Sequence, residues 1–200
     1  MELDVTAAVT GNGVVSFAVV PDSTDGVDFR SREAGTLIPE LVVQYGTAPA
    51  SPTFTATADA RVNRAVPDKN YPTQVLRCAG AGVDMESYLA FSVTGLTGTV
   101  TRARLRVYAN TSTVDGPEVW MTGAWSETGI TWNNRPVTVG SMITDSTNIP
   151  VGWYEFDVTS AVTGNGSFSF ELRPDSNDSV EFASRETAAK APVLIVETTP

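Results

Sequence analysis

The sequence contains no histidine among its 200 residues. This absence removes Ser–His–Asp and Cys–His nucleophilic sites, histidine-ligated zinc, and the most common general base at neutral pH. The two lysines, Lys69 and Lys190, lack a Ser-x-x-Lys context, and the carboxylates are scattered with no recognisable facing pair. We therefore predict that the protein is not an enzyme and has no cofactor, apart from a calcium ion that loop carboxylates could hold.

Cysteine and long apolar runs are scarce as well. Cys78 is the only cysteine, so an internal disulfide is excluded, and its strand-like surroundings predict a small buried side chain rather than a reactive thiol. No apolar run is long enough to span a membrane, and residues 1–4 do not resemble a signal peptide. The net charge of −10 disfavours partners such as nucleic acid or an anionic membrane surface.

What the sequence does contain is a pattern of short strands. Hydrophobic residues make up 42% of the chain, and glycine and proline recur along its whole length. Apolar and polar residues alternate over 89–93, 102–109 and 168–173, as in strands that are buried on one face only. We predict an all-β fold, an antiparallel β-sandwich or jelly roll, with a single helical turn over 157–162.

An internal repeat divides the chain. Residues 2–13 match residues 155–166 at ten of twelve positions, and the match continues at the same offset of 153 residues as far as Leu41 and Leu194. A constant register over that length indicates tandem units. We predict the C-terminal part of a preceding unit over 1–45, a linker over 46–52, and one complete unit over 53–200.

The partial unit is expected to need a partner. Residues 3–5, 15–19, 27–29 and 41–43 have the composition of strands, but the earlier strands that would pair with them are absent from this segment. Unpaired strand edges and an uncovered apolar face are costly and tend to acquire a partner. We expect residues 1–45 to pair with strands of another chain or to pack on the complete unit. The intermolecular arrangement, which would build a head-to-tail fibre unless symmetry closed it, is the one preferred.

Several motifs of the complete unit occur in the order of a known family. They are Thr57-Ala58-Asp59-Ala60, Asn70-Tyr71-Pro72, Tyr88-Leu89-Ala90-Phe91, Ala103-Arg104-Leu105-Arg106-Val107-Tyr108, Trp125-Ser126-Glu127, Ile130-Thr131-Trp132-Asn133-Asn134-Arg135-Pro136, Phe182-Ala183-Ser184-Arg185-Glu186 and Pro192-Val193-Leu194. This order resembles the DNRLRE domain family, part of which is grouped as carbohydrate-binding module family 96. The resemblance implies a β-sandwich module of secreted, cell-surface or polysaccharide-active proteins. Some members of the family bind alginate-type acidic polysaccharides.

One strand combines several side chains suited to a sugar ligand. Arg102, Arg104, Arg106 and Tyr108 share a face, and a row of guanidinium groups could hold uronate carboxylates by paired hydrogen bonds. The alternative is a solvated face that acidic residues of adjacent strands, such as Glu155 or Glu171, balance in charge.

Trp120 is the tryptophan best placed to stack on a sugar. It alternates with Val119 and Met121, so it faces outward if those two belong to the core. The other three tryptophans are expected to pack within the fold: Trp125, Trp132 and Trp153.

Acidic loop residues are the candidates for binding calcium. The segment 22–28 recurs as 175–181, and its oxygen-bearing side chains predict Ca²⁺ ligands at Asp175, Asp178 and Glu181. An ordinary hairpin turn accounts for the same composition. Asp59 and Asn70 form an alternative calcium pair. The Ser-Arg-Glu sequence at 184–186, also present in both copies, predicts an Arg–Glu pair that closes the last hairpin.

Two functions remain open from the sequence. The first is a non-catalytic, extracellular, carbohydrate-binding or adhesive module of a secreted tandem-repeat surface protein, with a polysaccharide as its partner. The second is a structural subunit of a fibre or stalk, assembled with neighbouring copies of the module by strand complementation and without a sugar ligand.

Overall fold

The computed structural model describes residues 2–43, 51–80 and 82–199. The chain forms two compact units, Met1–Gly46 and Thr47–Pro200. Most of the predicted linker, 46–52, lies outside the described residues. No helix in the described part of the chain is long and apolar enough to cross a membrane.

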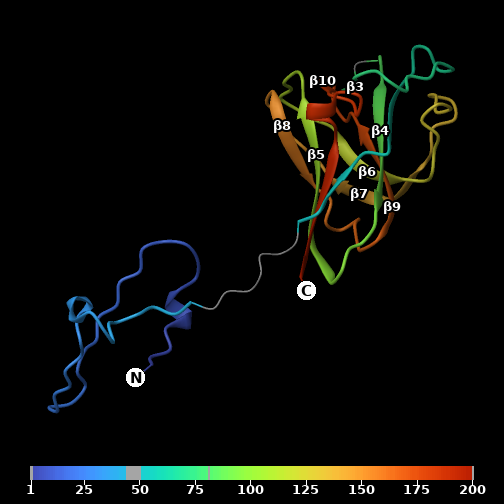
Figure 1. Ribbon diagram of the computed structural model, residues 1–200. Helices are drawn as coiled ribbons and strands as arrows, with labels where there is room; N and C mark the ends of the chain where they lie inside the picture. The colour runs from blue at the N-terminus through green and yellow to red at the C-terminus, as the bar shows by residue number, and fades with distance from the viewer. Residues whose placement is uncertain (1, 44–50, 81, 200) are drawn as a thin grey trace. The chain divides into compact units, whose positions relative to one another are not determined.

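The larger unit consists of antiparallel strands, which confirms the all-β prediction (Figure 1). Its strands are β1 (Thr53–Thr55), β2 (Ala58–Asn63), β3 (Leu76–Ala79), β4 (Met85–Val93), β5 (Thr99–Ala109), β6 (Glu118–Thr122), β7 (Thr138–Thr144), β8 (Gly152–Asp157), β9 (Gly166–Arg173), β10 (Ser179–Phe182) and β11 (Val193–Thr199). The predicted helical turn forms between β8 and β9 as one turn, in which Val162 N donates to Val158 O at 3.3 Å.

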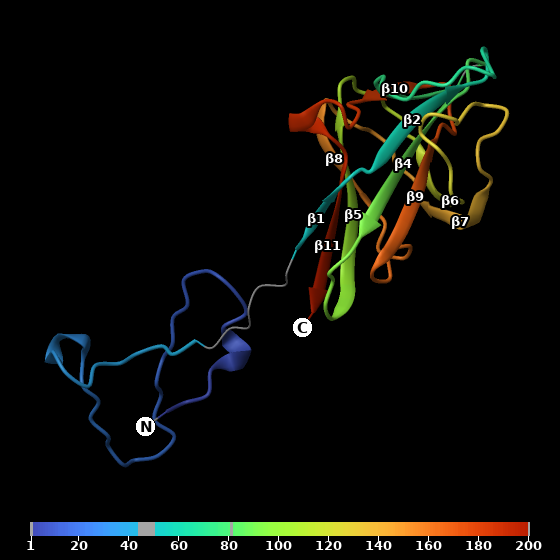
Figure 2. The ribbon, with the colours of Figure 1, turned by 45° about the vertical axis from the view of Figure 1, so that its right-hand side comes forward.

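Hydrogen bonds join all the strands into one sheet that folds over on itself. The order is β1-β11-β5-β10-β3-β4-β9-β6-β7, while β2 pairs with β4 and β8 pairs with β5. Figures 1 and 2 show β5, β8 and β11 on one side of the sandwich and β4, β6 and β9 on the other. The core lies between them, and it includes the fully buried side chains of Leu105, Phe170, Phe182 and Leu194.

The alternation along β5 explains both the core and the outer face of this layer. Ala103, Leu105, Val107 and Ala109 are fully buried, because successive side chains of a strand point to opposite faces. The arginines between them lie on the outside, as the sequence predicts.

A second, smaller cluster forms where the segment between β6 and β7 packs on β2 and β4. Trp125 and Trp132 pack against Val62, Tyr88 and Ile130. The Trp125 and Tyr88 rings meet edge to face, with 6.0 Å between their centroids. The predicted packing role of these two tryptophans is confirmed, and Cys78 is buried in the main core as expected.

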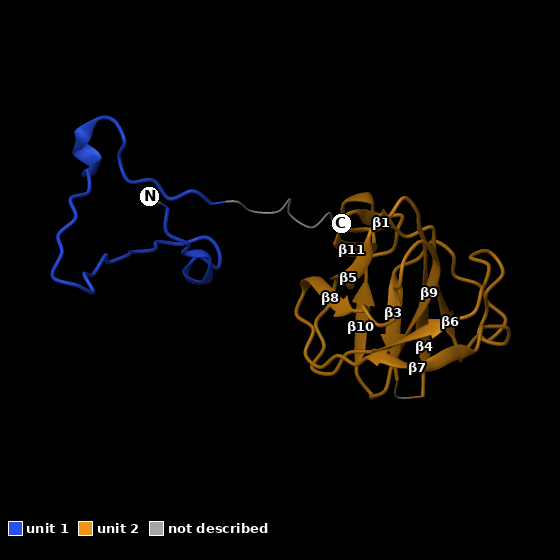
Figure 3. Cartoon of the chain, turned by 90° about the horizontal axis from the view of Figure 1, so that it is seen from below, with its two compact units in different colours: residues 1–46 blue, residues 47–200 orange. Residues whose placement is uncertain are grey.

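The smaller unit differs from its prediction (Figure 3). Residues 2–43 contain two 3-10 turns, η1 (Thr6–Ala8) and η2 (Arg32–Ala34), and no strand. The strands predicted at 3–5, 15–19, 27–29 and 41–43 are therefore wrong for this structure. A strand requires hydrogen bonds to a neighbouring strand, and no neighbour pairs with these segments here.

The consequence for side chains is visible at the repeated positions. Phe17, Phe29 and Leu41 are 49%, 53% and 48% exposed. Their counterparts in the complete unit, Phe170, Phe182 and Leu194, are fully buried. The same apolar positions that build the core of the larger unit thus face solvent in the smaller one.

Candidate functional site

The outer face of β5 carries the row of side chains predicted from the sequence. Arg102, Arg104, Arg106 and Tyr108 lie along it, and β11 pairs with β5 on one side. On the other side, β8 is in antiparallel register with β5 and adds its own outer residues, which are Trp153, Glu155 and Asp157. Tyr108 is directly opposite Trp153, and Arg106 is directly opposite Glu155.

Acidic neighbours fix the central arginine of the row. Arg104 Nη1 donates to Glu155 Oε2 at 2.7 Å, and its Nη2 donates to Glu197 Oε1 at 2.8 Å. The hydrogen bond to Glu155 raises the pKa of the Arg104 guanidinium. The balance of charge by Glu155 is therefore present as the alternative interpretation expects, whereas Glu171 is bound to Arg173 instead. Both terminal nitrogens of the Arg104 guanidinium donate to carboxylates, so its positive charge is largely balanced within the protein.

The other end of the row is aromatic and cationic. The Tyr108 and Trp153 rings meet edge to face at 5.4 Å between centroids. Arg106 Cζ lies 4.5 Å from the centre of the Trp153 ring, and Lys190 Nζ lies 3.9 Å from the centre of the Tyr108 ring. Trp153 remains 40% exposed. We call Arg102, Arg106, Tyr108, Trp153 and Lys190 the aromatic–cationic face.

The local charge of this region contrasts with that of the chain. Arg102, Arg104, Arg106 and Lys190 supply four positive charges here, and the neighbouring strands supply three carboxylates, which are Glu155, Asp157 and Glu197. Hydrogen bonds from Thr159 hold the pKa of Asp157 below its usual value, and the charge of Arg102 lowers it further. The region has a formal excess of one positive charge in a protein whose net charge is −10.

Trp120 lies elsewhere. It is on β6, which pairs with β7 and β9, and its Nε1 donates to Glu118 Oε2 at 2.8 Å. Arg173 Cζ lies 5.0 Å from the centre of its ring, and Val119 beside it is fully buried. Trp120 thus lies on a different strand from the arginine row, and its role in sugar binding stays a prediction.

Trp153 and Lys190 are the residues of the face that sequence reasoning missed, and Trp153 is the one that the sequence could have revealed. The expected role of Trp153 was packing, because Tyr154 and Phe156 follow it closely. The alternation of Trp153, Glu155 and Asp157 with Tyr154 and Phe156 is the signal that could have placed it on the outer face.

The predicted calcium residues are spread over β10 and the loop before it. Asp175 lies in the loop, where partial burial and the charges of neighbouring acidic residues raise its pKa. Thr113 Oγ1 lies 3.5 Å from Asp178 Oδ2, and Glu181 on β10 pairs with Arg77 at 3.6 Å. Calcium binding by these three residues stays a prediction.

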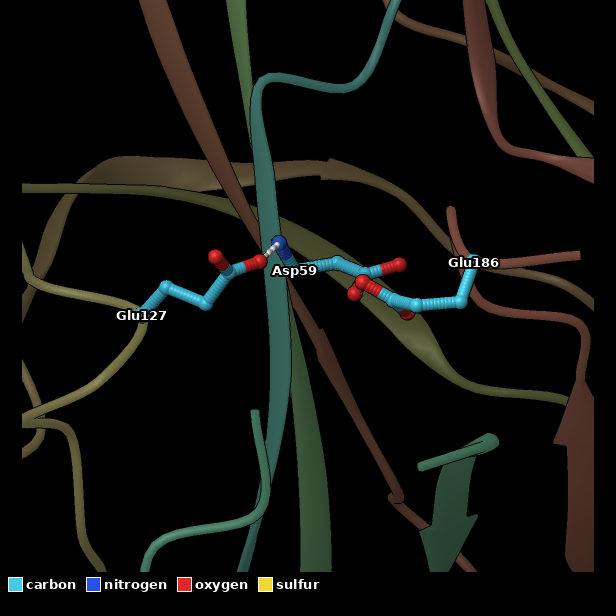
Figure 4. Close-up of side chains that lie close together, drawn as sticks. All are labelled: Asp59, Glu127 and Glu186. Carbon is cyan, nitrogen blue, oxygen red and sulfur yellow. Dashed lines mark hydrogen bonds between the residues drawn. The ribbon is translucent and has the colours of Figure 1, made fainter. Parts of the chain in front are cut away.

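A different set of carboxylates lies closer together. In the described part of the chain, the one group of three acidic residues with oxygens all within 4.8 Å of one another is Asp59, Glu127 and Glu186 (Figure 4). Asn70, the predicted partner of Asp59, uses its amide nitrogen to bind Glu127 O at 2.8 Å and Ile130 O at 2.6 Å.

Comparison with known proteins places the larger unit in a family context. The model of carbohydrate-binding module family 96 matches residues 50–198. A gellan lyase from a Bacillus species is 32% identical over 113 residues. That match covers 52% of this chain and 4% of the lyase, so the chain spans only a small part of this relative.

Proposed function

The chain belongs to carbohydrate-binding module family 96, and from this premise we propose that the larger unit binds an acidic polysaccharide through the aromatic–cationic face. The observation that carries the proposal is the exposed Trp153 ring beside Tyr108, with Arg106 and Lys190 next to the two rings. The apolar face of a pyranose can pack on an indole ring, and the flanking cations can pair with carboxylates of the sugar.

The charge pattern favours an acidic ligand over a neutral one. Arg102 and Arg106 flank Arg104, whose guanidinium is held by Glu155 and Glu197. Arg102 is exposed, and the closest approach of Arg106 to Glu155 is 3.7 Å. These two arginines retain hydrogen-bonding capacity for a uronate.

The proposed role is binding without catalysis. The chain has no histidine, and it spans 4% of the relative named a lyase. A module that holds a larger protein on an extracellular or cell-surface polysaccharide fits these features, and that placement is part of the proposal. The proposed function involves neither binding of nucleic acid nor insertion into a membrane.

Binding assays on a panel of polysaccharides test the proposal. Affinity electrophoresis of the full chain in gels containing gellan, alginate or a neutral glucan should show retardation by an acidic polymer. Retardation should decrease as the salt concentration rises, because the Debye screening length falls from about 10 Å at 0.1 M to about 3 Å at 1 M. Equal retardation by the neutral glucan, or no retardation by any acidic polymer, contradicts the proposal.

A second function is favoured by the smaller unit. We propose that residues 2–43 form strands only when they pair with another copy of the module, by strand complementation, so that copies assemble into a tandem array or fibre. The supporting observation is that Phe17, Phe29 and Leu41 are exposed although their repeat counterparts are core residues. Burial of a large apolar side chain stabilises an assembly by about 1.5–3 kcal/mol.

Deletion of residues 1–45 tests this second function. The larger unit has its own core, so the truncated protein should stay folded and monomeric. The full chain should show a higher mass by light scattering, with a mass that rises with concentration. If the two proteins are both monomers with equal melting temperatures, the assembly proposal is wrong.

A further inference from the structure

Three segments distant in the sequence converge at the acidic group shown in Figure 4. Asp59 is on β2, Glu127 lies between β6 and β7, and Glu186 lies between β10 and β11. Glu127 Oε1 accepts a hydrogen bond from Asp59 N at 2.9 Å, which fixes the first two segments together. Arg185 N donates to Asp59 Oδ2 at 2.7 Å, which fixes the third. Backbone N–H groups therefore hold the Asp59 and Glu127 carboxylates in place.

One oxygen of this group has no partner. Asp59 is fully buried, and while its Oδ2 accepts from Arg185 N, its Oδ1 has no hydrogen-bond partner in the structure. Buried carboxylate oxygens are rarely left unpaired, because each loses its hydration without compensation. In Figure 4 the Asp59 and Glu186 carboxylates lie next to each other, so the carboxylate that bears the unpaired oxygen belongs to the acidic group.

The positive charge next to the group is also too small to balance its carboxylates. Arg185 is the cation in contact with it, with Nε at 2.7 Å and Nη2 at 2.9 Å from the two oxygens of Glu127. The same Nε lies 3.4 Å from Glu186 Oε1. Three carboxylates and one guanidinium leave a formal charge of −2. Burial, with the charges of Glu186 and Glu127, raises the pKa of Asp59 to about 7.

We propose that Asp59, Glu127 and Glu186 bind one divalent cation with the chemistry of Ca²⁺. The ligands are all oxygens, which hard cations prefer, and a divalent ion would neutralise the formal charge. Calcium–oxygen distances of about 2.3–2.6 Å place opposite ligands about 4.6–5.2 Å apart. The carboxylate oxygens here, all within 4.8 Å of one another, fit that size. The ion would join β2 to two loops without touching a sugar.

The internal repeat gives this site a second line of support. Ser184-Arg185-Glu186 recurs as Ser31-Arg32-Glu33, although neighbouring positions such as Thr187 and Ala34 differ. In the smaller unit Arg32 and Glu33 are exposed and pair only locally in what the structure describes, at 2.6 Å. A turn retained in both copies is expected if its glutamate serves the same site whenever a unit is complete.

Calorimetric titration of the full chain with CaCl₂, after removal of metals with EDTA, tests the proposal directly. We expect one ion per chain with a dissociation constant on the order of 0.1–1 mM, the range of extracellular calcium modules. At 10 mM CaCl₂ the melting temperature should rise by about 3–10 °C. MgCl₂ at the same ionic strength should produce a smaller rise, because Mg²⁺ requires shorter and more regular coordination.

Variants separate this site from the acidic loop at 175–181. Asp59→Asn and Glu186→Gln should each remove the calcium-dependent shift, while the control Asp175→Asn should keep it. In EDTA the melting temperature of Asp59→Asn should be no lower than that of the unaltered protein, because the substitution removes a buried negative charge. In CaCl₂ it should be lower, because the variant does not gain the stabilisation by calcium. Glu186 is exposed, so its variant is expected to fold even if Asp59→Asn does not.

The outcomes that contradict the proposal are equally definite. If titration detects no calcium, the proposal is wrong, and Arg185 with a proton on Asp59 lowers the formal charge of the group to −1 without a metal. If Asp175→Asn abolishes the shift and Glu186→Gln does not, the ion belongs to the loop at 175–181. A shift that MgCl₂ and NaCl reproduce at equal ionic strength is general screening and also overturns the site.

Discussion

Replacement of Trp153 by alanine is the most direct test of the aromatic–cationic face. Trp153 is 40% exposed. A tryptophan side chain has about 250 Å² of surface, so roughly 100 Å² of it is accessible to a ligand. A sugar stacked on one face of the ring would cover about half of that area. At about 25 cal/mol per Å², the lost contact is worth about 1.3 kcal/mol, which is a tenfold weaker binding.

Trp120→Ala is the matched control for this variant. Both tryptophans lie on strands and have an arginine near the ring, at 4.5 Å for Trp153 and 5.0 Å for Trp120. Calorimetry with an acidic oligosaccharide should show about a tenfold loss of affinity for Trp153→Ala and less than a twofold loss for Trp120→Ala. Both variants should retain the far-ultraviolet circular dichroism spectrum of the unaltered protein.

Two results would refute this reasoning. Unchanged affinity in a folded Trp153→Ala protein would remove the aromatic–cationic face from consideration. A tenfold loss in Trp120→Ala alone would move the binding surface to β6, where the sequence analysis placed its stacking residue. A fall of about 2–6 °C in the melting temperature of Trp153→Ala is expected in either case, because contacts with Tyr108 and Arg106 are lost.

Three further changes test the structure around this face and in the core. Arg104→Ala should lower the stability by about 1–2 kcal/mol, measured by urea unfolding, because it breaks two ion pairs of a half-buried guanidinium; an unchanged midpoint would show that the pairs contribute nothing. Burial raises the pKa of the Cys78 thiol, so the native protein should resist Ellman's reagent at pH 8 and react fully in guanidinium; fast native labelling would contradict the burial. Gly80→Ala should lower the free energy of unfolding by about 1–3 kcal/mol, because the added Cβ would clash with the carbonyl oxygen of Ser176. The control Gly123→Ala meets open space and should not clash, so equal stabilities of the two variants would contradict the close approach at Gly80.

The strands of the larger unit could be predicted because their signal is local. Alternation over 102–109 gives the two faces of β5 directly, and the burial of Leu105 and Val107 follows from it. The same reasoning fails for residues 2–43, although they match 155–196 closely. Whether such a segment forms strands depends on neighbours that no local pattern specifies.

The site was predictable only in part for a similar reason. The arginine row lies on a single strand, so the alternation along the sequence was enough to predict it. Placing Trp153 beside Tyr108 required the register between β5 and β8, which is non-local. The group of Asp59, Glu127 and Glu186 joins segments that are 59 to 127 residues apart in the sequence, so only the folded chain brings its carboxylates together.

The loop between β10 and β11 connects the two proposed sites. It carries Glu186 of the acidic group and, four residues on, Lys190, whose ammonium lies over Tyr108. Thr187 N donates to Ser184 O at 2.9 Å, and Lys190 N donates to Thr187 O at 2.7 Å, so Glu186 and Lys190 lie in two successive turns that share Thr187. An ion bound by Glu186 would restrain these turns and with them Lys190, and linkage makes the effect on sugar binding reciprocal.

Calcium should therefore strengthen sugar binding modestly, by about 2–5-fold if the coupling is about 0.5–1 kcal/mol. The measurement is calorimetry with a short acidic oligosaccharide in EDTA and in CaCl₂. Glu186→Gln should remove the difference between the two conditions and leave the affinity in EDTA unchanged. Calcium can also bridge the sugar to the protein directly, and an enhancement that persists in Glu186→Gln would assign the effect to such bridging and refute the coupling through the loop.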